Sequence, residues 1–169
     1  MQKTLVLYSR ICPGDSKFTI QIFNMLKELP NVTAIKIDAN QPFDIPYEQE
    51  FIKQFDNVIL LFTMNWFNVP WSMSRYMAEV WRTGEFNLEN KNIVTIVTTG
   101  SPQKIYGDDG FGWTAMQYLN NLGSVFKRLK ANWQDHFFFH DCLHADENGA
   151  DFKNYLETIK NYYLEKINK

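Results

Sequence analysis

Val58-Ile59-Leu60-Leu61-Phe62, near the middle of the chain, is a run of apolar residues without a polar interruption. A strand with one face in solvent alternates apolar and polar side chains, so a run that is apolar at every position predicts a strand buried on both faces. Such a strand belongs at the centre of a parallel sheet that has helices packed on each side. The rest of the chain can be placed around this central strand.

The flanking sequence repeats one pattern, a short apolar strand followed by an amphipathic helix. Five such units predict an α/β fold, a doubly wound three-layer sandwich whose five-stranded parallel sheet has the order 2-1-3-4-5. The chain has 169 residues and no long linker or repeat, so we expect a single domain over residues 1–169. The predicted strands are 5–8, 32–37, 58–62, 93–97 and 137–139, and the predicted helices lie within 22–29, 48–54, 73–81, 119–129 and 152–163.

Composition and charge exclude several classes of protein. A net charge of -2 gives no overall attraction for a polyanion, so we expect no nucleic-acid binding. No apolar run approaches the roughly 18 residues of a membrane span, and the amino terminus lacks the pattern of a signal peptide. We therefore expect a cytoplasmic protein. Cys12 and Cys142 are far apart in sequence and have neither redox nor metal-site spacing, so we interpret them as reduced, structural thiols.

Ligands of a doubly wound sheet bind beyond the carboxyl ends of the strands, which directs attention to three loops. The first, residues 9–19, precedes a helix whose amino terminus offers unpaired N–H groups to a phosphate. Arg10, Ser16 and Thr19 could add further donors, although Ser16 could equally be an ordinary helix cap. The loop matches neither a Walker loop nor a GxGxxG turn, which argues against ATP or a Rossmann dinucleotide here.

The second and third loops follow the third and fourth predicted strands. In residues 63–71, Trp66 and Phe67 offer a flat apolar wall to a planar ligand, with core packing as the alternative interpretation. In residues 98–112, glycines permit close approach of a backbone to a ring, and Tyr106 could donate a hydrogen bond or be an ordinary turn residue.

A metal site is the alternative use of the carboxyl-terminal third of the chain. His136, His140 and His144 lie close in sequence, with Asp141 and Cys142 between them. Strand histidines are usually structural, and three ligands along an extended segment converge poorly. We therefore predict no metal site.

Two segments resemble a known family, the flavodoxin-like NAD(P)H:quinone oxidoreductases of the small bacterial type. Asn65-Trp66-Phe67-Asn68-Val69-Pro70, followed by a helix and Gly84-Glu85-Phe86, is similar to the family's Q-W-F/Y-x-[VI]-P segment and its G-E-F. Thr98-Thr99-Gly100 with Tyr106 is similar to the family's T-T-G-G and its following tyrosine. The resemblance runs from the first strand to about residue 142 and implies a flavodoxin-like fold.

The family also implies a function and a set of site residues. It implies an FMN-dependent oxidoreductase that passes hydride from NAD(P)H to quinones by ping-pong kinetics, acting as a homodimer. FAD is the less favoured cofactor, because the stretch after Phe86 is short. By position, the family implies phosphate contacts from Arg10, Ser16, Phe18 and Thr19, isoalloxazine contacts from Met64, Asn65, Trp66 and Phe67, and contacts on the pyrimidine side from Thr98, Thr99, Gly100, Ser101 and Tyr106. Tyr106 is the only side chain implied to be catalytic.

The chain departs from the family pattern at several positions, one of which is Arg10, where a histidine is usual. Gly112 stands where some members have a histidine, Ser101 replaces the second glycine, and Ala78 stands where an acidic residue is frequent. Other functions therefore stay open: azo- or nitroreduction by the same flavin, and a regulatory FMN-binding subunit of a cation-efflux system, which would have a membrane transporter as its partner.

Overall fold

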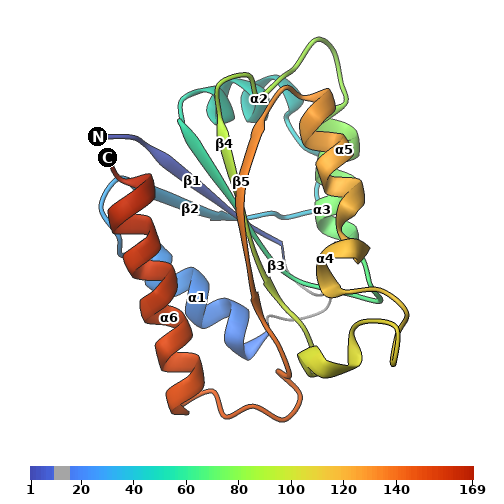
Figure 1. Ribbon diagram of the computed structural model, residues 1–169. Coiled ribbons are helices and arrows are strands. Elements are labelled where there is room, and N and C mark those ends of the chain that lie inside the picture. Colours follow the sequence, from blue (N-terminus) through green and yellow to red (C-terminus); the bar gives the residue numbers. More distant parts are fainter. Residues whose placement is uncertain (10–15) are drawn as a thin grey trace.

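The computed structural model describes residues 1–9 and 16–169, and in this part of the chain five strands form one parallel sheet (Figure 1). Their order is β2-β1-β3-β4-β5, which confirms the predicted topology. The strands are β1 (Thr4–Ser9), β2 (Val32–Lys36), β3 (Asn57–Thr63), β4 (Asn92–Thr98) and β5 (Asn132–Phe139). The predictions that fall on Arg10 and Cys12 lie outside the described residues.

The two central strands, β1 and β3, are buried along their whole length, as the apolar run at 58–62 predicted. Successive side chains point to opposite faces of the sheet and so build two separate cores. Leu60 and Phe62 belong to the core beneath α2 (Ile45–Lys53), α3 (Trp71–Tyr76), α4 (Ala115–Tyr118) and α5 (Asn120–Arg128). Ile59 and Leu61 belong to the core beneath α1 (Lys17–Lys27) and α6 (Ala150–Tyr162). Figure 1 shows α1 and α6 together on one side of the sheet and α3 and α5 on the other.

The edge strand β5 begins earlier than predicted. The sequence indicated a strand only at 137–139, but pairing with β4 starts at Asn132 and passes a register shift beside Ile93 and Val94. The first part of β5 contains polar, largely exposed residues. Backbone hydrogen bonding to a neighbour, and not apolar periodicity, makes this segment a strand.

Two of the predicted helices change type or break along their length. The helix predicted at 73–81 is α3 followed by a π-helical turn, η1 (Met77–Trp81). The helix predicted at 119–129 is preceded by the short α4, where Thr114 and Gln117 form a reciprocal capping box. The remaining helical turns are η2 (Gln103–Ile105) and η3 (Tyr163–Ile167). None of the helices in the described ranges has both the length and the apolar character needed to cross a bilayer.

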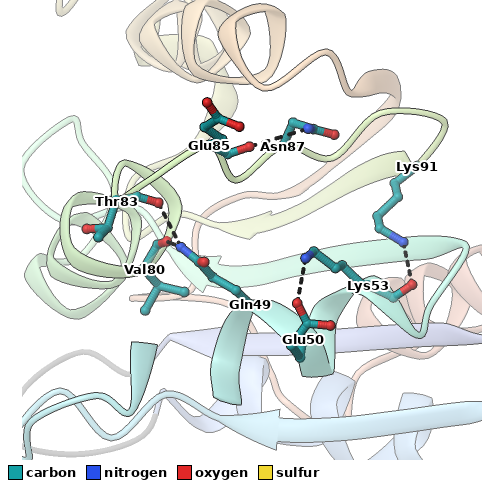
Figure 2. A network of polar contacts seen from close by, with 8 residues as sticks. All are labelled: Gln49, Glu50, Lys53, Val80, Thr83, Glu85, Asn87 and Lys91. Carbon is teal, nitrogen blue, oxygen red and sulfur yellow. Dashed lines mark hydrogen bonds and ion pairs between the residues drawn. The ribbon is translucent and has the colours of Figure 1, made fainter. Parts of the chain in front are cut away.

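A polar network joins α2 to the end of η1 (Figure 2). The side-chain amide of Gln49 donates to the carbonyl oxygens of Val80 (2.6 Å) and Thr83 (2.9 Å), and Lys91 donates to the carbonyl oxygen of Lys53 (2.9 Å). Carbonyl groups in the last turn of a helix lack partners within the helix, and the bonds to Val80 and Lys53 satisfy two of them. The segment from Thr83 to Lys91 is thereby held against α2.

Candidate functional site

The carboxyl ends of the inner strands are joined to α1 by a closed ring of hydroxyl groups. Thr19 on α1, Thr63 at the end of β3 and Thr98 at the end of β4 are buried, and their Oγ1 atoms lie 2.7, 2.8 and 2.9 Å apart. A hydroxyl has one proton to donate, so each member donates once and accepts once. A second buried pair, Ser9 and Ser72, has its Oγ atoms 2.6 Å apart and joins the end of β1 to α3. These bonds fix the three predicted loops relative to one another.

Beyond the end of β3, residues 65–68 form a two-residue hairpin turn. The backbone N–H of Asn65 donates to the oxygen of Asn68 (2.8 Å), and the N–H of Asn68 donates back to Asn65 (3.0 Å). The two central residues, Trp66 and Phe67, have φ values of 46° and 62°, so the turn is of type I′. That turn normally requires Asn or Gly, because an L side chain in the left-handed region costs about 1–2 kcal/mol. Strain of this kind is characteristic of functional sites.

The turn places its two aromatic side chains in different surroundings. Trp66 is 88% exposed, whereas Phe67 is half-buried. The Phe67 ring lies 5.0 Å from that of Phe111 and 4.7 Å from that of Tyr118. Phe111 in turn contacts Tyr106 at 5.4 Å. The second and third predicted loops are therefore joined by a chain of rings, while the Trp66 ring stays free to cover a ligand.

Tyr106 lies beside a hydrogen-bonded pair formed by Thr99 and His140. Thr99 Oγ1 donates to the carbonyl oxygen of Ser101 (2.9 Å), so its contact with His140 Nδ1 (2.9 Å) uses a proton on the imidazole. In neutral His140 the other nitrogen, Nε2, is then the acceptor. The rings of His140 and Tyr106 are 5.6 Å apart. A histidine thus lies beside Tyr106 although position 112 holds glycine.

Burial shifts the pKa of both groups. It raises the pKa of the Tyr106 phenol, and the neighbouring hydroxyls of Thr99 and Ser101 offset part of this shift. Burial lowers the pKa of His140 below its ordinary value of 6.5. At neutral pH, Tyr106 is a hydrogen-bond donor and His140 is uncharged.

The loop after β4 continues alongside the loop after β5. Backbone N–H groups of Asp141, Cys142 and Leu143 donate to the carbonyl oxygens of Ser101, Thr99 and Gly100. A Cβ atom on Gly100 would meet the Leu143 side chain at 3.4 Å, and one on Gly110 would lie 2.1 Å from the Ile105 carbonyl oxygen. We expected the glycines of this loop to allow close approach of a ligand ring. Gly100 and Gly110 instead allow close approach of Leu143 and of the Ile105 backbone.

Several residues predicted to touch a ligand directly lie beneath the surface. Phe18 is packed in the core against Phe139 and Phe152, at ring distances of 5.3 and 4.8 Å. Thr19 and Thr98 belong to the hydroxyl ring, and Thr99 and Met64 are buried. Ser16 accepts a hydrogen bond from the N–H of Thr19 (3.5 Å), the geometry of an ordinary helix cap. The groups brought to the surface are the turn at 65–68, Ser101, Tyr106 and the first turn of α1.

The three histidines of the metal hypothesis have separate surroundings. His140 pairs with Thr99, His144 pairs with Asp141 (2.6 Å), and His136 packs between Trp133 and Phe138. Within residues 1–9 and 16–169 no three His, Cys, Asp or Glu side chains converge as metal ligands would. Burial raises the pKa of the Cys142 thiol to about 12, so this thiol is unreactive.

The donor set at this edge fits a planar ring system that carries a phosphate. The first-turn N–H groups of α1 suit an anion, and the exposed Lys17, whose Nζ lies 3.8 Å from a carboxylate oxygen of Glu147, adds a positive charge beside them. Trp66 supplies a flat apolar surface, and Tyr106, which is connected to the turn through Phe111 and Phe67, supplies a donor. The residues present are compatible with a flavin mononucleotide.

The sequence interpretation missed four aromatic residues near this edge. Phe111, Trp113, Tyr118 and His140 all contact the ring chain. Their spacing in the sequence follows no helical or strand period, because they come from an irregular loop, a short helix and a strand end. The high aromatic content, 16%, was the available signal.

Two of the curated proteins that this chain resembles have the same identity to it. The chain is 27% identical over 123 residues to the glutathione-regulated potassium-efflux system ancillary protein KefG of Cronobacter sakazakii. This match covers 68% of this chain and 67% of KefG. It is 27% identical over 126 residues to the uncharacterized NAD(P)H oxidoreductase YdeQ of Bacillus subtilis. This match covers 69% of this chain and 64% of YdeQ. The matched segment thus spans about two thirds of each relative.

Three solved structures share the fold over nearly the whole chain. An NADPH-quinone reductase from P. pentosaceus has a TM-score of 0.80 and 20% identity and covers 98% of this chain and 99% of its own. The general stress protein 14 of Treponema denticola, in complex with FMN, has a TM-score of 0.75 and 20% identity and covers 96% of each chain. A thermophilic tryptophan halogenase from Streptomycin violaceusniger has a TM-score of 0.81 and 15% identity and covers 96% of this chain and 99% of its own. At these identities the structures establish the fold alone.

A family model described as "Flavodoxin-like fold" matches residues 2–163, almost the whole chain. The protein belongs to this family of flavodoxin-like proteins.

Proposed function

We propose that the protein binds FMN at the carboxyl edge of its sheet and passes hydride from NAD(P)H to a quinone-type acceptor by ping-pong kinetics. The observation that carries this proposal is the type I′ turn with Trp66 and Phe67 at its centre. A left-handed conformation at two aromatic residues is costly, and one of the two rings gains no burial from it. A flat ligand covering Trp66 accounts for both features.

The described residues divide the work of holding such a ligand. The first turn of α1, with Ser16 and Lys17, binds the phosphate, and the 65–68 turn lies against the ring system. When bound, FMN supplies the two-electron chemistry that links the nicotinamide to the acceptor. Tyr106, whose raised pKa keeps it protonated, donates a hydrogen bond where negative charge develops. Replacement of Tyr106 by Phe should lower turnover about tenfold, the effect of one lost hydrogen bond.

Absorbance spectroscopy of the purified protein tests the first half of the proposal. The expected result is a flavin spectrum, either as isolated or after incubation with FMN, and mass spectrometry of the released chromophore then separates FMN from FAD. A protein that stays colourless in excess FMN and in excess FAD would overturn the proposal.

The relationship to KefG favours a second candidate, a regulatory FMN-binding subunit of a cation-efflux system with a membrane transporter as partner. Steady-state oxidation of NADH in the presence of menadione distinguishes the two. An oxidoreductase gives parallel lines in double-reciprocal plots at several menadione concentrations, whereas a regulatory subunit holds flavin with negligible turnover. Replacing menadione by an azo or nitroaromatic dye tests the remaining acceptors.

The family also suggests where and how the protein works. We propose a cytoplasmic homodimer with the active sites at the subunit boundary. Sedimentation of the flavin-loaded protein measures the oligomeric state, and a monomer would contradict this part of the proposal without affecting flavin binding.

A further inference from the structure

A pocket of about 280 Å³ lies between η1 and the end of α5, on the side of the sheet that α3 and α5 cover (Figure 1). Nearly all of its lining surface is apolar, and the apolar side chains that form it are Met77, Ala78, Trp81, Val125 and Leu129. Its volume is just below the usual range of small-molecule sites, so it suits a small ligand. None of the residues assigned above to the flavin lines it. We call it the helix pocket.

Two arginines, Arg82 and Arg128, also border the helix pocket, and no acidic residue does. Because the lining surface is almost entirely apolar, the arginines contribute their methylene stems to the wall, and their guanidinium groups extend beyond it. Both residues are exposed, and within residues 1–9 and 16–169 neither guanidinium group has a hydrogen-bond or ion-pair partner. The rim of an apolar pocket is therefore positively charged.

Cationic side chains are favoured at the carboxyl ends of helices in general, so the two charges alone would not indicate a site. The wall itself has two unusual features. The N–H of Arg82 donates to the carbonyl oxygen of Met77, five residues earlier (3.1 Å), and π-helical turns of this kind are frequent at functional sites. The indole N–H of Trp81 is buried and has no hydrogen-bond partner in the described part of the chain, which is rare for a buried donor. Core packing alone explains neither feature.

An apolar wall with a positive rim selects a ligand of two parts. An alkyl chain is stabilised by burial against apolar side chains. A carboxylate is the group that guanidinium binds with paired, charge-assisted hydrogen bonds. A nucleotide or a sugar phosphate would use the rim but not the wall, and a neutral hydrocarbon would use the wall but not the rim.

We propose that the helix pocket binds the alkyl chain of a medium-chain fatty acid, with the carboxylate held at the rim by Arg82 and Arg128. The proposal is independent of the proposed function, because this binding requires neither flavin nor turnover.

The probe is decanoate, below its critical micelle concentration, with the purified protein as isolated. Isothermal calorimetry should show saturable binding, and ¹⁵N–¹H NMR should show a shift of the Trp81 indole signal while that of Trp66, at the candidate flavin site, stays in place. Acetate, which lacks the chain, and decyltrimethylammonium, which carries the opposite charge, should both bind more weakly. Absence of saturable decanoate binding, or a shift of Trp66 without one of Trp81, would overturn the proposal.

A double variant, Arg82→Gln with Arg128→Gln, tests the rim. Glutamine keeps part of each stem and removes the charge, so decanoate affinity should fall about tenfold or more through the lost charge-assisted hydrogen bonds. Lys153→Gln with Lys166→Gln, at exposed positions of α6 and η3, changes the net charge equally on the other side of the sheet and should leave the affinity unchanged. Equal affinities of the two double variants would contradict a role for the arginines.

Ala78→Leu tests the wall, because the added side chain extends from an exposed residue that lines the helix pocket. Leucine is a strong helix former, so the helical turn is retained while decanoate binding should weaken. Asn161→Leu, at an exposed position of α6, is the matched control and should bind decanoate as the wild type does. If Ala78→Leu changes the sedimentation coefficient in the absence of decanoate, the surface is a contact between subunits and the proposal is wrong.

Discussion

Two layers at the carboxyl edge of the sheet are built in opposite ways. The lower layer, the hydroxyl ring of Thr19, Thr63 and Thr98, is buried and each of its members is paired. The upper layer, the turn that carries Trp66 and Phe67, is strained and partly exposed. The difference teaches that backbone strain is confined to the layer that would touch a ligand. In the other layer all three hydroxyl groups are hydrogen-bonded, and these bonds hold the loops in place.

The largest expected change in the free energy of unfolding comes from a substitution in the lower layer. Thr98→Val keeps the shape of the side chain but opens the hydroxyl ring, so a buried donor and a buried acceptor lose their partners. The free energy of unfolding in urea should fall by about 1–3 kcal/mol. Thr33→Val, on the exposed side of the edge strand β2, is the matched control and should change it by less than about 0.5 kcal/mol. Similar losses in both variants would show that the ring does not support the edge.

The upper layer should respond in the opposite direction. Trp66→Asn replaces an exposed aromatic by a residue that tolerates the left-handed region, so the free energy of unfolding should rise by about 1 kcal/mol. Trp66→Ala removes the same ring and keeps the backbone strain, and it should not stabilise the protein. Under the proposed function, both variants bind FMN more weakly than the wild type. Equal stability of the Asn and Ala variants would mean that the turn is not strained.

The smallest expected effect concerns pH and the side of the site near β5. The pKa of His140 is lowered in the folded protein, so protonation favours the unfolded state. Its contribution to stability is complete above about pH 6.5 and is lost as the pH falls below that value. His140→Phe removes this dependence. The wild type should therefore lose stability relative to the variant in urea titrations between pH 7 and pH 5, whereas a difference that is constant with pH would indicate a packing change alone.

The sequence predicted the fold well because local periodicity and topology rules act together. The buried run at 58–62 placed β3 in the centre, and five β-α units left the observed strand order as the common arrangement. The sequence did not predict two features, the start of β5 and the short helix α4. The polar start of β5 at Asn132 follows from pairing with β4, and the early helical turn α4 follows from a cap at Thr114.

The structure brings only some of the predicted site residues to the carboxyl edge of the sheet. The aromatic loop at 63–71 and the position of Tyr106 lie at the expected edge. The sequence gives no direction for a side chain, however, so Phe18 and Thr98 were expected at a ligand although they face the protein interior. It also gave no reason to place His140 next to Tyr106, because the two residues are neighbours only through the pairing of β4 with β5.

By itself, the sequence determined which segments are strands and helices, their order in the sheet and the three loops at its carboxyl edge, since these depend on short-range patterns of apolar side chains. Only the tertiary structure decided that three threonines close a hydroxyl ring, that Trp66 and Phe67 occupy a left-handed turn, and that His140 lies beside Tyr106. These features depend on contacts between distant residues and on backbone torsions, and neither leaves a periodic trace in the chain.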